Sequence, residues 1–274
     1  MLHRVKYLEL HVAHTCNLSC EACGHYSQHH AGGVVSLAEA FNWSKKWNDR
    51  IDPETLGLLG GEPTLHPDLC EFVRTMKMSW PRAQLVIKTN GFFLYRHPNL
   101  RKTLFETGTE LEINCHSEAP DYLHHYKKIL EHIWDWSDIK ITLKNSTDSE
   151  KARPWTRKYF GFGNTLQPFN DQNPRHSWEL CHAKRCLTLF EGRLWKCPPI
   201  AYLKIVSKNY SLNSNWTPYL NYSGLTSDCT SEELSFFLKQ EEEPICGMCP
   251  AREIRVEKGN PLHVQKSNWE KEKR

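Results

Sequence analysis

The 274-residue chain lacks the long apolar run that a membrane-spanning helix requires. Crossing a bilayer takes about 20 consecutive apolar residues, and no stretch of the sequence approaches that length. The opening residues, MLHRVKYLEL, contain neither a long apolar stretch nor a small-residue cleavage site, so no secretory signal is expected. We therefore expect a cytoplasmic protein without a membrane partner.

An excess of charge of either sign is also missing. The 35 lysines and arginines face 32 aspartates and glutamates, which leaves a formal charge of +3. This balance gives no electrostatic reason to expect nucleic acid as a partner. The sequence shows no internal repeat, heptad pattern or low-complexity tract. Its length allows a sizeable core in one large domain, or in one large domain and one small one.

Cysteine, by contrast, is abundant. The chain has eleven cysteines, and an odd number cannot all form intramolecular disulfides. Without a secretory signal, clustered cysteines favour metal or redox chemistry over structural cross-links. The spacing of the cysteines should decide which chemistry they support.

The first half of the chain alternates between strand-like and helix-like periodicity. The predicted strands are residues 7–13, 55–59, 84–89, 110–115 and 139–143, and the predicted helices are residues 37–47, 68–79, 94–106 and 122–134. Repeated strand–helix units imply an α/β fold with a parallel sheet and right-handed crossovers, either open or curled into a full or partial barrel.

The second half of the chain differs from the first in composition and periodicity. Residues 154–178 are rich in Gly, Pro, Asn and aromatic side chains, and they predict a linker or an ordered loop over a site. Residues 187–196 predict a hairpin of two short strands, and residues 231–243 predict a last helix. Residues 251–274 are charged, and we expect them to form a peripheral C-terminal tail.

Three cysteines lie in one loop directly after the first predicted strand, in the run Cys16-Asn-Leu-Ser-Cys20-Glu-Ala-Cys23. These short intervals let the loop wrap one face of an iron–sulfur cube. With only three local thiolates, a fourth iron stays open to another ligand, as substrate-level chemistry at a cluster requires. The alternative is a structural zinc site completed by His14 or His25.

The next two predicted strands also end in small and polar residues. Residues 60–63 read Gly-Gly-Glu-Pro, in which the glycines let the backbone approach a small ligand and the carboxylate can accept an ammonium group. The third strand ends in Thr-Asn-Gly at residues 89–91. Each motif alone is typical of a turn, but all three loops occupy the rim where such folds bind ligands.

The C-x3-C-x2-C loop, the GGEP motif and the TNG motif together resemble the radical S-adenosylmethionine (radical SAM) superfamily. The resemblance implies a partial (β/α)6 TIM-like barrel over residues 1–153. It also implies a [4Fe-4S] cluster on Cys16, Cys20 and Cys23, whose open iron chelates the amino and carboxylate groups of S-adenosylmethionine (SAM). One electron, from a flavodoxin or ferredoxin type of reductant, then cleaves SAM to a 5′-deoxyadenosyl radical that abstracts hydrogen from a small-molecule substrate.

The same resemblance implies a set of SAM-binding residues. They are Ala22, Gly60, Gly61, Glu62 and Asn90, with the GGE segment at the ammonium group. The family usually has an aromatic residue before the third cysteine, where this sequence has Ala22. His25 or Tyr26 is the candidate to replace the missing aromatic residue beside the adenine group of SAM.

Six cysteines lie beyond the predicted barrel, and five of them form a second set of candidate ligands. These five are Cys181, Cys186, Cys197, Cys246 and Cys249. A hairpin with one ligand at its start and one at its end, closed by a later C-x2-C pair, can enclose a metal with four thiolates. Spacing alone leaves zinc and an iron–sulfur cluster equally open.

This second pattern resembles the Twitch module, a short form of the SPASM domain that holds an auxiliary cluster. The resemblance rests on C-x-A-x-R, a turn glycine, a cysteine five residues later and the distal C-x2-C. It implies a small domain at residues 154–250, built on a hairpin and a helix, with a second [4Fe-4S] cluster. The implied ligands are Cys181, Cys197, Cys246 and Cys249, with Cys186 as the alternative to Cys181. Five available cysteines favour a closed site that accepts an electron.

Three further residues are candidates for catalysis. Cys115 and His116 end the fourth predicted strand at the same rim. Cys115 could return a hydrogen atom to a substrate radical in an epimerase, although a small buried thiol without such a task is more common. Arg153 enters the segment between the two cysteine regions, where a cation could orient a hydroxyl or phosphate group.

The function predicted first is a radical SAM oxidoreductase that dehydrogenates a sugar, cyclitol or nucleotide-sugar, with the auxiliary cluster as electron acceptor. The alternatives are a radical SAM epimerase with a cysteine hydrogen donor and a peptide-modifying maturase. The lack of a recognisable leader-binding domain argues against the maturase. A non-catalytic zinc or iron–sulfur protein is the alternative from another class.

Overall fold

A seven-stranded sheet forms the centre of the computed structural model, which describes residues 2–147, 156–256 and 259–263. Its strand order is β5-β4-β3-β2-β1-β8-β9, and every neighbouring pair is parallel except β8 and β9. The first five strands are β1 (His3–Ala13), β2 (Ile51–Gly60), β3 (Gln84–Thr89), β4 (Glu110–Cys115) and β5 (Ile141–Asn145). Four helices connect them: α1 (Leu37–Lys45), α2 (Leu69–Ser79), α3 (Leu100–Thr107) and α4 (Pro120–Ile133). The predicted strand–helix alternation is confirmed, and the fold is a partial TIM-like barrel.

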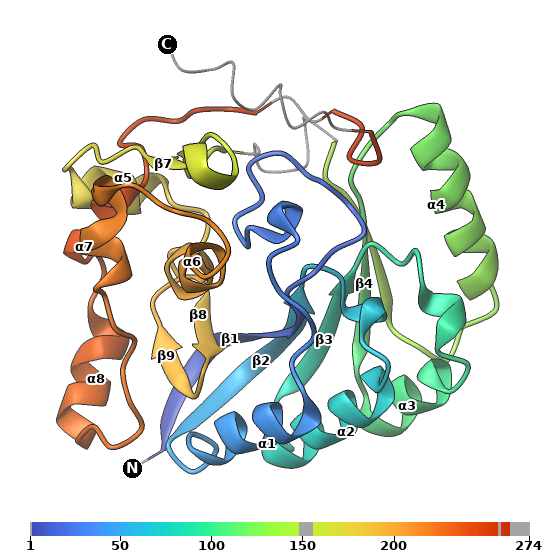
Figure 1. Ribbon diagram of the computed structural model, residues 1–274. Helices are drawn as coiled ribbons and strands as arrows, with labels where there is room; N and C mark the ends of the chain where they lie inside the picture. Colours follow the sequence, from blue (N-terminus) through green and yellow to red (C-terminus); the bar gives the residue numbers. More distant parts are fainter. Residues whose placement is uncertain (1, 148–155, 257–258, 264–274) are drawn as a thin grey trace.

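The helices of the first half cover one face of the sheet (Figure 1). Helix α2 shows why: Leu69, Phe72, Val73 and Met76 recur at helical spacing and are all buried. They join a core cluster that also contains the leucines of β1. Since side chains alternate along a strand, the residues between those leucines point to the opposite face of the sheet.

The hairpin of β8 (Leu187–Phe190) and β9 (Arg193–Trp195) extends this same sheet. Strand β8 pairs in parallel with β1, with Leu8 opposite Leu187 and Leu10 opposite Leu189. The sixth parallel strand therefore comes from the C-terminal half and covers the free edge of β1 instead of following β5. A four-residue strand carries no sequence signal for its partner, so this pairing was not predicted.

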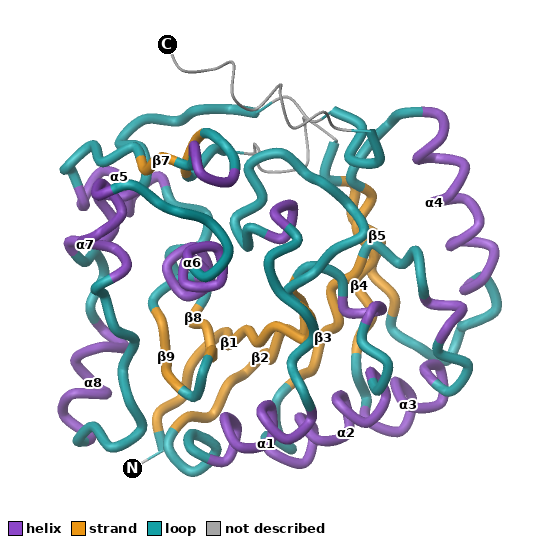
Figure 2. Tube along the Cα trace, viewed as in Figure 1, coloured by secondary structure: helices purple, strands orange, loops and turns teal. Residues whose placement is uncertain are grey.

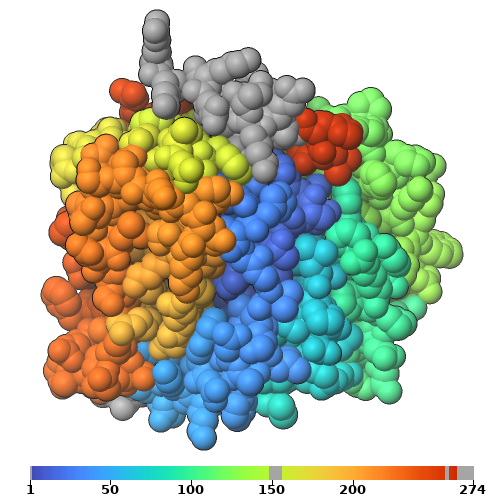
Figure 3. Space-filling view, in the orientation of Figure 1, coloured from blue at the N-terminus to red at the C-terminus, as the bar shows by residue number. Residues whose placement is uncertain are grey.

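Helix α6 (Pro198–Ser207) was also not predicted, because it has no polar face. Residues 198–203 and Val206 are all buried, so the sequence shows none of the alternation that marks an amphipathic helix. The ring of Tyr202 stacks on His11 of β1 at a centroid distance of 3.5 Å. Helix α6 therefore covers the face of β1 opposite to α1 and α2. In Figure 3 the orange surface of the C-terminal half lies directly beside the blue surface of the N-terminal part of the chain.

The remaining elements are short. They are β6 (Tyr159–Phe160), β7 (Gln167–Pro168), α5 (Pro174–Leu180), α7 (Thr217–Leu220) and α8 (Ser231–Lys239). Figure 2 shows that the segment between β1 and α1, which carries the first three cysteines, is loop apart from a single 3₁₀ turn at Ser27–His29. No helix in the described ranges is both long and apolar enough to cross a bilayer.

Candidate functional site

The three cysteines of the first loop lie close together. The pKa of the Cys16 thiol is raised well above its usual value by burial, and then by the nearby charges of Glu62, Cys20 and Cys23. All eleven cysteines fall within the described residues, and none of them forms a disulfide. The loop therefore brings three reduced thiols close together.

Backbone amides point at two of these sulfurs. The amide of Leu18 donates to Cys16 Sγ at 3.4 Å. The Cys23 sulfur accepts hydrogen bonds from the backbone of His25, Tyr26 and Ser27, which lower its pKa, although burial is the largest influence and raises it. N–H groups directed at cysteine sulfurs stabilise thiolates and tune the potential of iron–sulfur clusters. This donor set fits a cluster bound through three cysteines.

The two glycines at the end of β2 permit a very close approach to the cysteine loop. A Cβ atom on Gly60 would lie 2.0 Å from the carbonyl oxygen of Ala13, and one on Gly61 would lie 1.9 Å from that of Thr15. The backbones are joined where they meet, because Gly61 N–H donates to Ala13 O at 2.8 Å and Glu62 N–H to Thr15 O at 2.9 Å. The two glycines thus allow the cysteine loop to pack against the end of β2. The sequence had predicted only that they let the backbone approach a ligand.

Glu62 connects the ends of β2 and β3 through hydrogen bonds. Its buried carboxylate accepts hydrogen bonds from Thr64 N at 2.9 Å, Thr64 Oγ1 at 2.6 Å, the Thr89 hydroxyl and Asn90 N at 2.8 Å. Burial raises the pKa of this carboxyl, while these hydrogen bonds act in the opposite direction. Oε1 receives three of the four donors, so Oε2 keeps room for a further one. An ammonium group at Oε2 would fit this arrangement.

Asn90 connects the TNG motif to the cysteine loop. Its Nδ2 donates to Asn17 Oδ1 at 2.9 Å and lies 3.9 Å from Cys16 Sγ. Ala22 adopts a left-handed backbone conformation, with φ of 52°, and is buried. The structure therefore brings the predicted SAM-binding residues Gly60, Gly61, Glu62 and Asn90 around the start of the loop.

Cys115, at the end of β4, lies beside the same loop. It packs with Leu18 and Tyr122 in a small apolar cluster that Cys16 and Cys20 also contact. Its thiol is buried and donates to the carbonyl oxygen of Ser117 at 3.4 Å. The neighbouring residue, His116, donates its backbone N–H to the Tyr122 hydroxyl at 3.1 Å. The third catalytic candidate, Arg153, lies outside the described residues.

Four of the five candidate ligands in the C-terminal half come together at the ends of three elements. Cys181 follows α5, Cys197 precedes α6, and Cys246 and Cys249 belong to a 3₁₀ turn at Pro244–Met248 and its end. Burial raises the pKa of Cys197 well above its usual value, and the charges of Cys181, Cys249 and Cys246 add to this effect. Burial raises the pKa of Cys249 to about 12, with further contributions from Cys181 and Cys246.

Cys186 is placed elsewhere. It lies directly before β8, and its charge is among those that raise the pKa of Tyr7 on β1, after burial and Glu9. The thiols whose charges raise the pKa of Cys197 are those of Cys181, Cys246 and Cys249. The geometry thus favours Cys181 over Cys186 as the fourth member of the second set.

Two tyrosines join the two sets of cysteines. Tyr26 is buried in the cluster around α6, against which Cys197 and Cys249 also pack. Tyr159 donates its hydroxyl to the carbonyl oxygen of Cys23 at 2.7 Å. Sequence reasoning did not find this contact, because the partners are far apart in the chain and neither lies in a periodic pattern.

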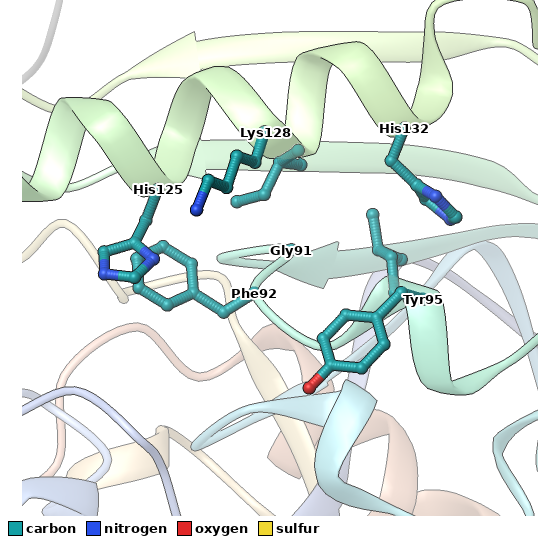
Figure 4. A pocket seen from close by; sticks show the side chains of 8 residues that line it. Gly91, Phe92, Tyr95, His125, Lys128 and His132 are labelled. Carbon is teal, nitrogen blue, oxygen red and sulfur yellow. The ribbon is translucent and has the colours of Figure 1, made fainter.

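A pocket of about 270 Å³ lies between α4 and the segment that follows β3 (Figure 4). Its lining residues are Gly91, Phe92, Leu94, Tyr95, His125, Lys128, Ile129 and His132. The rim carries a lysine and two histidines, as Figure 4 shows, but no cysteine. We therefore assign the site to the thiols and not to this pocket.

Comparison with known proteins gives a family match over more than half of the chain. The family model described as the Radical SAM superfamily matches residues 10–162. GTP 3′,8-cyclase from Microcystis aeruginosa is 26% identical over 125 residues, which are 44% of this chain and 37% of that protein. GTP 3′,8-cyclase from Edwardsiella ictaluri is 33% identical over 94 residues, which are 33% of this chain and 28% of that protein. The matches thus span about a third of the length of these curated relatives.

Among solved structures, the chain is similar to BtrN, described in complex with AdoMet and 2-DOIA. The TM-score is 0.51 at 16% identity, and the match covers 91% of this chain and 94% of that one. At this identity the likeness shows the fold, and it extends into the C-terminal half of the chain.

Proposed function

This chain belongs to the radical SAM superfamily, and we propose that it dehydrogenates a small polar substrate at a carbon that carries a hydroxyl group. Sugars, cyclitols and nucleotide-sugars are the substrate classes that we propose. The family implies a [4Fe-4S] cluster and SAM. When bound, these groups supply a 5′-deoxyadenosyl radical that abstracts hydrogen from a substrate.

The chain's own residues fit that chemistry at the first loop. The thiols of Cys16, Cys20 and Cys23 are reduced and lie close together. Backbone N–H groups point at the sulfurs of Cys16 and Cys23. Glu62 presents a buried carboxylate with one oxygen still able to accept, which suits the ammonium group of SAM. Because all of these groups belong to neighbouring strand ends, the sheet holds them in a fixed arrangement.

The gathering of Cys181, Cys197, Cys246 and Cys249 is the observation that carries the proposal. Four protein thiolates close a metal centre, so that it has no position for substrate. A closed cluster there supplies an acceptor for one electron. Dehydrogenation of an alcohol releases one hydrogen atom to the radical, one electron to such an acceptor and one proton from the hydroxyl group. The second site therefore matches what this reaction needs.

Epimerisation is the second candidate, because Cys115 is buried beside the first loop. A thiol in that place could return a hydrogen atom to the opposite face of a substrate radical. The two reactions differ in their products, since dehydrogenation removes two hydrogen atoms and epimerisation conserves mass. A Cys115→Ala variant also separates them, because only the epimerase would lose its product.

The substrate test uses anaerobic, reduced protein incubated with SAM and a panel of sugars, cyclitols, nucleotide-sugars and GTP. GTP is included because the curated relatives carry its name. We expect 5′-deoxyadenosine whose formation depends on one added compound, together with a product lighter by two hydrogen atoms. A product of unchanged mass would overturn dehydrogenation in favour of epimerisation. Cyclisation of GTP would overturn both.

The metal test compares Cys181→Ala with Cys186→Ala. Two [4Fe-4S] clusters correspond to about eight irons per chain. We expect Cys181→Ala to lose about half of this iron and Cys186→Ala to keep it, because the charge of Cys181 acts on Cys197 and that of Cys186 acts on Tyr7. Zinc in place of iron at both sets would end the proposal of an enzyme.

We also propose a flavodoxin or ferredoxin type of electron donor and a cytoplasmic location. Eleven unbridged cysteines suit a reducing compartment. The balanced charge gives no reason to add nucleic acid as a partner.

A further inference from the structure

The inner face of β1 carries polar side chains that neither cysteine set uses. Glu9 and His11 alternate along the strand with the core residues Leu8, Leu10 and Val12. His25, from the cysteine loop, reaches the same place. One ligand atom from each of Glu9, His11 and His25 lies within 4.8 Å of the other two.

Two of these groups are buried without the partners that burial requires. Glu9 is 2% exposed and His11 is fully buried. Within the described residues, Glu9 Oε1 and His11 Nε2 have no hydrogen-bond partner. Nε2 of the His25 ring lies 3.6 Å from Glu9 Oε1, beyond hydrogen-bond distance. Buried polar atoms are normally paired, so this arrangement indicates a ligand that completes it.

His11 has one ring nitrogen engaged and, within the described residues, one without a partner. Its Nδ1 lies 2.9 Å from Nδ1 of His14, and its ring is held against Tyr202. When Nδ1 of His11 donates its proton to His14, Nε2 presents a lone pair. Metal-binding histidines are commonly oriented in this way, by a hydrogen bond from the ring nitrogen that does not bind the metal.

We propose that Glu9, His11 and His25 bind one divalent transition-metal ion, for which zinc is the best match. Two imidazole nitrogens and one carboxylate oxygen are a known set of three protein ligands for zinc. Ligand atoms around a tetrahedral zinc ion lie about 3.3 Å apart, given metal–ligand distances of about 2.0 Å. The observed 3.6 Å between Glu9 and His25 is close to that spacing. The fourth position would be open to water or to an oxygen atom of a substrate.

An ordinary ion pair between Glu9 and His25 is the simpler account of the same contact. It leaves Nε2 of His11 without a partner in the described part of the chain. A metal ion satisfies all three groups together. His25 is partly exposed, with a side-chain exposure of 22%, so an ion has an entry path from that side.

The test measures zinc in protein purified anaerobically with its iron in place. We expect about one zinc per chain in addition to the iron, and a zinc X-ray absorption spectrum with nitrogen and oxygen neighbours only. Sulfur neighbours at about 2.3 Å would mean that zinc occupies the cysteines, which would overturn the proposal. The zinc content does not depend on which reaction the protein catalyses. The test of this zinc site is therefore independent of the test of the proposed function.

Variants then assign the ligands. Glu9→Gln and His25→Gln should each weaken zinc binding at least tenfold, measured by Zn²⁺ competition with a chromophoric chelator, while the iron content stays unchanged. His25 is the safer position, because its side chain is partly exposed and its replacement does not open the core. His124→Gln, on the exposed side of α4, is the matched control and should bind zinc as the wild type does. Equal zinc affinity in His25→Gln and His124→Gln would overturn the proposal.

Discussion

The rings of Tyr26 and Tyr159 stack with their centroids 4.7 Å apart and their planes inclined by 24°. Burial raises the pKa of Tyr26 well above its usual value, and Tyr159, Cys249, Cys197 and Cys23 add to this effect through their charges. Tyr26 is therefore close to cysteines of both sets. Since Tyr159 also binds the Cys23 carbonyl, this aromatic pair joins the linker to both candidate clusters.

Tyr159→Phe should destabilise the protein while keeping the stacked rings. The variant leaves the carbonyl oxygen of Cys23 without the hydroxyl that donates to it at 2.7 Å. That oxygen still accepts the backbone N–H of Tyr26, but Gln28 Nε2 loses the hydroxyl to which it donates. A buried donor left unpaired costs about 1–3 kcal/mol, and urea unfolding under anaerobic conditions measures this loss. The electron paramagnetic resonance spectrum of the reduced first cluster should shift as well.

Tyr95→Phe is the control for this change, because Tyr95 is 62% exposed. Surface substitutions of this kind change the free energy of unfolding by about 0.5 kcal/mol or less. Equal stability of the two variants would contradict the role assigned to the Tyr159 hydroxyl.

Gly61→Ala should displace the cysteine loop. The new methyl group would lie 1.9 Å from the carbonyl oxygen of Thr15, and the backbone there has no flexible side chain that could move aside. We expect iron to be lost from the first site while the second site keeps its iron, so that about half of the total remains. Gly33→Ala is the matched control, since nothing lies within 4 Å of its added Cβ atom. Full iron content in Gly61→Ala would show that the loop tolerates the change.

Glu62→Gln should weaken SAM binding at least tenfold. The substitution removes the negative charge proposed to face the ammonium group of SAM. In either orientation the new NH₂ group meets a backbone N–H, that of Thr64 or that of Asn90. Equilibrium dialysis with labelled SAM measures the affinity, and Glu39→Gln on the exposed surface of α1 is the control. Wild-type affinity in Glu62→Gln would separate this carboxylate from the SAM site.

His66 should make the protein less stable as the pH falls below 6.5. Burial lowers the pKa of its ring below the ordinary value of 6.5, although the hydrogen bond with Val35 O at 2.8 Å acts in the opposite direction. The other ring nitrogen accepts the Asp68 N–H at 2.9 Å. The unfolded chain therefore takes up a proton at a higher pH than the folded chain. Below pH 6.5 the free energy of unfolding should fall by up to about 1.4 kcal/mol per pH unit from this group.

The measurement is a series of anaerobic urea unfolding curves between pH 7.5 and 5. His66→Gln should be less stable at neutral pH, since it loses the ring that joins Val35 to Asp68, and its stability should depend less steeply on pH. An unchanged slope in the variant would show that other groups cause the acid sensitivity.

The sequence by itself determined the parallel α/β fold and the place of the three motifs. Strands and helices of the first half are marked by local periodicity, and each motif directly follows a predicted strand, so the rim of the sheet was the expected location. The spacing of the first three cysteines also needed no tertiary information, because one loop carries them all.

Only the tertiary structure decided which distant groups meet. It placed β8 beside β1, covered the inner face of β1 with α6, and put Cys181 with Cys197 while Cys186 lies near Tyr7. It also brought His25 to Glu9 and His11. The physical reason is that periodicity and turn chemistry act over a few neighbouring residues, whereas these contacts follow from how packed elements share buried space.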